Sequence, residues 1–344
     1  MFARVGGCFA ICLLSSVAVA QEPGARVLAR FALGGSGGWD YPTLDPRSHR
    51  LYLARADHVQ VVDTTDGKAV AAIADTPGVH GIALAPELGK GFISCGKANV
   101  VKVFDLRSNA VIASIAAGEN PDAILFDAKT RRVFAFNGRS HDVTVIDAKD
   151  HRVLATIALD GVPEFARSDE AGKVFVNIED KAQLAVIDSA KATLKSYFPL
   201  PHCEGPTGLA LDVTRRRSFS SCGNKTLTVL DMDSGKAIAS LPIGARSDGA
   251  EFDGASKTIF SANGEGNLSR IREVDADHYE SLPELETQRG ARTLALDEPG
   301  RRLFLPTAQY AQKSPTDDPR ARPQVVPESF VVLVVDIAIQ SGRN

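Results

Sequence analysis

One repeated hairpin constrains this 344-residue chain more than any other feature. Residues 142–159, DVTVIDAKDHRVLATIAL, have the pattern of two strands joined by a polar turn that begins at Asp147. An Asp at this place is typical of turns, because its carboxylate accepts hydrogen bonds from backbone N–H groups two residues further on. A lone hairpin is only marginally stable in water, so this one needs neighbours.

The neighbours are copies of the same hairpin. The acid that ends its first strand recurs at five intervals of 41 to 43 residues and a last interval of 63, at Asp63, Asp105, Asp147, Asp188, Asp231, Glu273 and Asp336. The long last interval contains a Pro-, Asp- and Arg-rich insertion at 309–328. Seven copies with this period predict an all-β fold, a seven-bladed β-propeller that occupies residues 21–344 as a single domain.

The two ends of the chain are expected to share the last blade. Three strands of that blade are predicted at 293–297, 302–306 and 330–336, and too few residues follow for a fourth. The strand predicted at 27–33 has no partner upstream. We expect this N-terminal strand to complete the last blade, because closing the ring removes sheet edges that would otherwise invite aggregation.

The first 20 residues have the pattern of a signal peptide. Arg4 provides the positive charge, residues 5–14 are apolar, and Ala18-Val19-Ala20 is a small-residue cleavage site. We therefore expect an exported protein, periplasmic or extracellular, without membrane insertion. The formal net charge of −3 gives no support to a nucleic-acid partner, which normally needs a basic face. We expect a monomer.

Export permits disulfides, and three cysteines follow the predicted signal peptide. Cys203 and Cys222 are predicted at the same end of two adjacent antiparallel strands of the fifth blade, which favours a disulfide between them. The alternative is three inert thiols. Cys95 is expected to be a small buried residue and not a nucleophile.

The repeats resemble those of a known family. The segments VLDMDSGK at 229–236, NPDA at 120–123 and GPTG at 205–208 are similar to the YVTN repeats of YncE-like proteins, which are secreted bacterial seven-bladed propellers. The resemblance covers about residues 25–338 and implies the fold more than any activity. WD40 repeats are a poorer match, because neither Trp-Asp nor Gly-His recurs at the period.

Acids gather at one position of the repeat. The residue after the Pro position that precedes each inner strand is, blade by blade, Asp40, Gly81, Asp122, Glu164, Thr207, Asp248 and Arg292. In a propeller these loops lie on the top face, where the inner strands begin, so four acids would surround the mouth of the central channel. Like charges so close repel unless Arg292, a cation or a basic ligand compensates them.

Two interpretations of these acids stay open. In the first, Asp40, Asp122, Glu164 and Asp248 are ligands for a divalent cation, and calcium would suit such oxygen donors. In the second, each acid only accepts hydrogen bonds from backbone N–H groups of its own turn. No cofactor is required beyond this cation.

Other residues of the top face are candidate ligand contacts. Trp39 is either a stacking platform for a ligand ring or ordinary packing. His80, which precedes Gly81, is either a ligand contact or a solvated or turn-bonded histidine. Arg289 and Arg292 at the last blade either bind a carboxylate or phosphate or only neutralise the acids.

The insertion at 309–328 follows Tyr310, a further candidate ligand contact, and contains four prolines. We expect a stiff polar loop, not a strand. Loops of this length in compact domains are usually functional lids or disordered.

Together these features favour a binding or scaffold protein that recognises a small polar ligand, a peptide or a protein partner on its top face. The alternative is a metal-assisted hydrolase of the lactonase sort, because propeller lactonases hold a central metal with Glu, Asn and Asp. In that case Asp248 or Glu164 would be the general base. Asn137 and Asn263, after two second strands, would either join the acids or form Asn-Gly turns.

Overall fold

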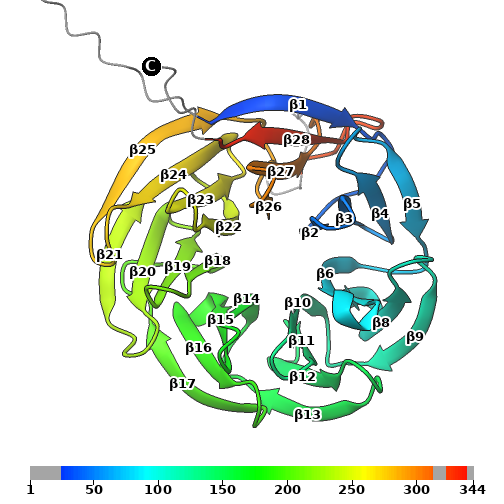
Figure 1. The fold of residues 1–344 in the computed structure, drawn as a ribbon, viewed down its shortest axis with the longest axis horizontal. Coiled ribbons are helices and arrows are strands. Elements are labelled where there is room, and N and C mark those ends of the chain that lie inside the picture. The colour runs from blue at the N-terminus through cyan, green and yellow to red at the C-terminus, as the bar shows by residue number, and fades with distance from the viewer. Residues whose placement is uncertain (1–24, 313–322, 339–344) are drawn as a thin grey trace, which may run out of the picture.

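The computed structural model describes residues 25–312 and 323–338. Within them, seven four-stranded antiparallel sheets are arranged radially around one axis (Figure 1). The predicted all-β, seven-bladed propeller is thus confirmed. The predicted signal peptide at 1–20 and the middle of the insertion lie outside the described residues.

Each blade runs from an inner strand at the channel to an outer strand at the rim. The inner strands are β2 (Pro42–Asp45), β6 (Val79–Ala85), β10 (Pro121–Asp127), β14 (Pro163–Ser168), β18 (Pro206–Asp212), β22 (Ser247–Asp253) and β26 (Ala295–Asp297). The second strands are β3 (Arg50–Arg55), β7 (Lys90–Cys95), β11 (Arg132–Asn137), β15 (Lys173–Ile178), β19 (Arg217–Cys222), β23 (Thr258–Asn263) and β27 (Arg302–Thr307).

The outer half of each blade is the hairpin of the repeat. Its third strands are β4 (His58–Asp63), β8 (Val100–Asp105), β12 (Asp142–Asp147), β16 (Gln183–Asp188), β20 (Thr226–Asp231), β24 (Asn267–Glu273) and β28 (Val331–Asp336). Its outer strands are β5 (Ala69–Ile73), β9 (Val111–Ala116), β13 (Val153–Ala158), β17 (Thr193–Pro199), β21 (Ala237–Pro242), β25 (Tyr279–Glu286) and, at the last blade, β1 (Arg26–Ala32). The described helices are the single 3-10 turns η1 (Pro86–Leu88), η2 (Gly96–Ala98) and η3 (Glu179–Lys181).

The repeated Asp has the predicted turn chemistry. Oδ1 of Asp147 accepts hydrogen bonds of 2.9 Å from the backbone N–H groups of Lys149 and Asp150. Asp231 accepts the equivalent bond from Ser234 N–H at 2.8 Å. Each carboxylate thus satisfies backbone donors of the tight turn that starts the outer strand.

The ring closes through the two ends of the chain. β1 pairs antiparallel with β28, from Arg26 opposite Asp336 to Ala32 opposite Val331, and the two strands lie side by side at the rim in Figure 1. Phe31 of β1 packs 6.2 Å from the ring of Phe304. The predicted closure of the last blade by the N-terminal strand is confirmed.

The described ends of the insertion pair with each other. Tyr310 forms an isolated β-bridge with Val325. Ala311 N–H donates to Gln324 O at 2.8 Å, and Val326 N–H donates to Gln309 O at 2.9 Å. Neither described end of the insertion is part of a strand, as expected for a loop, and these bonds provide partners for its backbone donors.

The sulfur atoms of Cys203 and Cys222 are bonded, and their Cα atoms are 5.4 Å apart. Both residues belong to a hydrophobic cluster between the fourth and fifth blades. Cys95 is a free, buried cysteine. Burial raises its pKa to about 11, so its thiol is not reactive at neutral pH.

The double variant Cys203→Ser/Cys222→Ser should lower the free energy of unfolding by about 3 kcal/mol, because the disulfide closes a loop of 19 residues that the unfolded chain could otherwise open. Urea unfolding of the oxidised protein and of the variant would measure the difference. Reduction of the wild-type protein is the control and should reproduce it. Equal stability of all three samples would contradict the prediction.

Candidate functional site

The inner strands all begin on one face, the top face, and the acids of the repeat meet there. The strand register changes one predicted member of this set. Val79 pairs with Cys95 as Pro121 pairs with Asn137, so His80 is the structural equivalent of Asp122, and Gly81 is not. The prediction placed Gly81 there because it took His80, and not Val79, as the equivalent of Pro121.

Six side chains form what we call the channel-mouth cluster. They come from blades 1, 2, 3, 4, 6 and 7: Asp40, His80, Asp122, Glu164, Asp248 and Arg292. Four carboxylates thus face one guanidinium and one imidazole. The cluster spans separate blades, which contradicts the interpretation that each acid only caps its own turn.

Three of these side chains have the arrangement of metal ligands. His80 Nδ1 lies 2.7 Å from Asp40 Oδ2 and 3.7 Å from Asp122 Oδ1. One ligand atom from each residue lies within 4.8 Å of the other two. The side chains are partly buried, with exposed fractions of 19%, 29% and 21% for Asp40, His80 and Asp122. His80 is therefore neither solvated nor bonded to its own turn, as the alternative interpretation of this residue had it.

Arg292 balances the opposite side of the cluster. Its Nε donates a 2.6 Å hydrogen bond to Asp248 Oδ2, and its Nη2 lies 3.9 Å from Asp40 Oδ1. Arg289 does not share this role, because its guanidinium lies 5.3 Å from the ring centre of Tyr310. Of the two arginines, only Arg292 neutralises acids in the described part of the chain.

Tyr41, which the sequence did not single out as a site residue, crosses the channel. Its hydroxyl donates a 3.0 Å hydrogen bond to Glu164 Oε1, from the first blade to the fourth. Its ring lies 4.8 Å from that of Phe165. The available signal was its place next to Asp40, directly before an inner strand.

The closeness of the carboxylates shifts their protonation. Burial, with the charge of Asp40, raises the pKa of Asp122 to about 7. Burial, with the charges of Asp122 and Asp248, raises the pKa of Glu164 well above its usual value. Burial raises the pKa of Asp248 to about 6, although Arg292 opposes this.

The pKa of His80 is raised as well, but for a different reason. Burial lowers the pKa of His80, but the hydrogen bond to Asp40 and the charges of Asp122 and Asp40 outweigh it, so the net shift is upward. The imidazole thus tends to be protonated when no other cation is present. Because the carboxylates of the cluster repel one another, an added positive charge would stabilise it.

Two predicted ligand contacts lie elsewhere. Trp39 is only 7% exposed and packs against Phe330 and Tyr310, with ring centres 5.6 and 6.1 Å away. Core packing accounts for its position, and the stacking-platform interpretation is wrong. Tyr310 packs between Trp39 and Arg289 at the base of the insertion, outside the cluster.

The asparagines after the second strands do not join the acids. Asn137 is buried and donates to Asp142 and Thr144 of its own blade. Asn263 is buried and donates to Asn267 and Ser269. Both brace the blade below the top loops, so the polar funnel considered for a lactonase does not include them.

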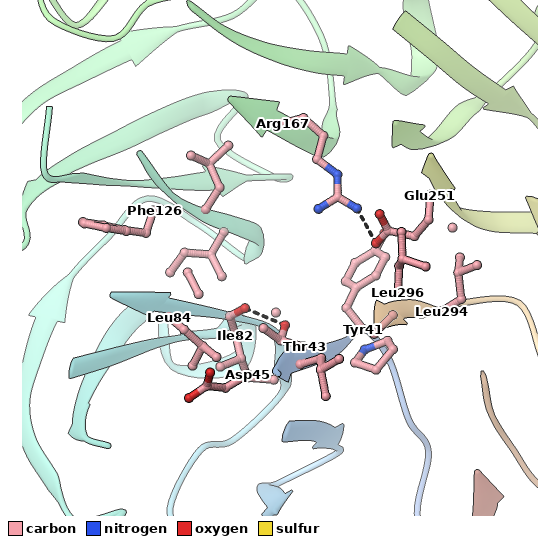
Figure 2. Close-up of a pocket in the computed structure, with 18 of the residues that line it drawn as sticks. Tyr41, Thr43, Asp45, Ile82, Leu84, Phe126, Arg167, Glu251, Leu294 and Leu296 are labelled. Carbon is pink, nitrogen blue, oxygen red and sulfur yellow. Dashed lines mark hydrogen bonds and ion pairs between the residues drawn. The ribbon is translucent and has the colours of Figure 1, made fainter. Parts of the chain in front are cut away.

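Below the cluster, the channel widens into a cavity of about 750 Å³, the lower cavity. It begins at Tyr41 and Phe165 and reaches the bottom turns near Asp45 and Glu298. Figure 2 shows Tyr41 among the labelled side chains, close to the Arg167–Glu251 pair. No member of the channel-mouth cluster lines this cavity among the described residues, so the two features occupy opposite halves of the channel.

Asp122→Asn should make thermal stability less dependent on pH. The folded protein holds the Asp122 proton up to about pH 7, whereas an ordinary Asp releases it near 3.8. Between these two pH values, binding of the proton stabilises the folded protein most at the lower pH. This stabilisation is lost as the pH rises toward about 7. Melting temperatures at both ends of this pH range, with a chelator present, should therefore differ less in the variant.

Asp75→Asn is the matched control, because this carboxylate is 81% exposed and lies outside the cluster. Its melting temperatures should follow those of the wild-type protein. If Asp122→Asn did the same, the raised pKa of Asp122 would be wrong.

No family model matches this chain, and no curated protein sequence matches it. Among solved structures, the hydrazine synthase of Kuenenia stuttgartiensis is similar, with a TM-score of 0.68 and 14% sequence identity. The match covers 78% of this chain and 92% of that chain. No helix among the described residues is long and apolar enough to cross a membrane. At this level of identity the likeness shows the β-propeller fold alone.

Proposed function

We propose that this protein is a binding module that holds a divalent cation at the mouth of its central channel and recognises a small polar ligand there. The observation that carries the proposal is the convergence of Asp40, His80 and Asp122 from three blades, with ligand atoms within 4.8 Å of one another. A cation at this point would offset both the burial and the neighbouring charge of Asp40, which together raise the pKa of Asp122.

The presence of His80 in the cluster affects which metal ion the site would prefer. Calcium prefers a shell of oxygen atoms, whereas an imidazole nitrogen beside two carboxylates suits zinc or manganese better. We therefore place these two metals ahead of the calcium expected from the acids alone. His80 must lose its proton to bind them, so affinity should fall at low pH.

The cluster supports binding better than hydrolysis. A general base must be unprotonated and free to accept a proton. Glu164 accepts a 3.0 Å hydrogen bond from the Tyr41 hydroxyl, and Asp248 is engaged by Arg292 at 2.6 Å. Neither carboxylate is thus well placed for the base role of the lactonase alternative.

The remaining parts of the proposal rest on the sequence. The pattern of residues 1–20 supports export to the periplasm or beyond, and the YVTN-like segments support a YncE-like type. A monomer remains our proposal, with a peptide or protein partner on the top face as an alternative occupant.

Titration of the purified, chelator-treated protein with ZnCl2 or MnCl2, followed by calorimetry, tests the metal site. We expect one site per chain and a higher melting temperature with metal. His80→Ala and Asp122→Asn should each weaken binding by about 100-fold or more, since outer-shell partners alone are commonly worth about 10- to 100-fold.

The control is His58→Ala, because His58 begins β4 outside the cluster and its ring hydrogen-bonds to the exposed Asp57. Its metal affinity should equal that of the wild-type protein. Absence of binding by zinc, manganese and calcium would overturn the metal site, and binding that survives His80→Ala would place it elsewhere.

A further inference from the structure

The lower cavity is independent of the channel-mouth cluster and has a chemistry of its own. Its volume of about 750 Å³ lies within the range of small-molecule sites, roughly 300–1,000 Å³. Tyr41 and Phe165 close it toward the top face, and the bottom turns surround its opening. A ligand would therefore enter from the bottom face.

The repeat builds an apolar ring into the walls. In six of the seven inner strands, the residue just before the last paired residue has a large, half-buried apolar side chain. These residues are Leu44, Leu84, Phe126, Leu211, Phe252 and Leu296. Four of them line the cavity: Leu44, Leu84, Phe126 and Leu296. Apolar surface grouped in a concave site marks a place where an apolar ligand is favourable.

One wall breaks this pattern. At the inner-strand position one residue before this ring, five blades have Thr, Ala or Leu. The fourth blade has Arg167 there, and the sixth has Glu251. Their side chains form a 2.6 Å ion pair in front of the fifth blade, and Arg167 Nε also donates to Leu209 O at 3.1 Å. Figure 2 shows Arg167 reaching toward Glu251 across the space that the apolar side chains line.

The ion pair has one donor left over. Arg167 uses Nε and Nη2, and Nη1 has no hydrogen-bond partner among residues 25–312 and 323–338. The pair as a whole is neutral. Glu251 would repel an anionic head group bound to Arg167. Arg167 would likewise repel a cationic head group bound to Glu251. A carbonyl oxygen can accept from Nη1 without disturbing the pair.

We propose that the lower cavity binds an uncharged amphiphile, with its carbonyl head group on Arg167 and its apolar chain against the ring of Leu44, Leu84, Phe126 and Leu296. Size, wall chemistry and the neutral ion pair all favour this class over fatty acids and over alkyl amines. The site does not depend on the proposed metal.

The test uses the full-length mature protein and the neutral fluorescent dye N-phenyl-1-naphthylamine. We expect saturable dye binding and displacement by decanamide. Decanoate and decylamine share the alkyl chain but carry opposite charges, and each should need a concentration about tenfold higher or more, because a charge is costly to place in a partly desolvated site beside a like charge. Preference for decanoate would overturn the uncharged class, and no saturable binding would overturn the site.

Two variants in one blade locate the binding. Leu84→Glu places a charge in the apolar ring and should weaken dye and decanamide binding by about tenfold or more. Ile112→Glu is the matched control, because Ile112 is 50% exposed on the outer strand of the same blade. Equal binding by the two variants would place the probes outside the cavity.

The head-group contact is tested by replacing both charges at once, since removing one would leave a partly buried charge unpaired. Arg167→Met/Glu251→Leu should retain dye binding and lose the preference for decanamide over decanoate. If the preference persisted, the assignment of Arg167 would be wrong. Asp122→Asn should leave all of these affinities unchanged, which separates this site from the channel-mouth cluster.

Discussion

The pairing of β1 with β28 is the interaction on which the rest of the molecule depends. It joins residues about 300 positions apart and turns a row of blades into a ring. The closure also assembles the site, because it brings the first blade against the last. Thr293 Oγ1 donates to Asp40 O at 3.2 Å, and Arg292 Nη2 lies 3.9 Å from Asp40 Oδ1. Without the ring, neither contact could form, and Asp40 would lie far from Arg292.

The closed ring brings together the residues that stand at the start of each inner strand. Seven such positions converge on one axis, so a substitution that is harmless in an isolated blade becomes part of a crowded electrostatic site. Here four carboxylates meet one arginine and one histidine, and burial together with the charge of Asp40 raises the pKa of Asp122 to about 7. The repulsion among these buried carboxylates is the physical reason for proposing a cation site at the mouth of the channel.

Two cross-channel contacts divide the axis into compartments with different chemistry. Tyr41 bonds to Glu164, and Arg167 pairs with Glu251 below it. Above these contacts the channel is acidic, and below them it is lined by half-buried apolar side chains. These contacts thus divide the channel of this propeller into two compartments that differ in the chemistry of their side chains.

The sequence by itself determined the number of blades, the shared last blade and the turn role of the repeated Asp, because these follow from a period and from local hydrogen bonding. It also placed Asp40, Asp122, Glu164 and Asp248 at one level of the ring. Only the tertiary structure decided that His80, and not Gly81, completes that level, since Val79 pairs with Cys95 as Pro121 pairs with Asn137. The role of Tyr41, the burial of Trp39 and the Arg167–Glu251 pair were likewise decided by contacts between blades that are far apart in the sequence. A repeat pattern specifies what each blade contains, but which side chains meet across the channel depends on the diameter and twist of the closed ring.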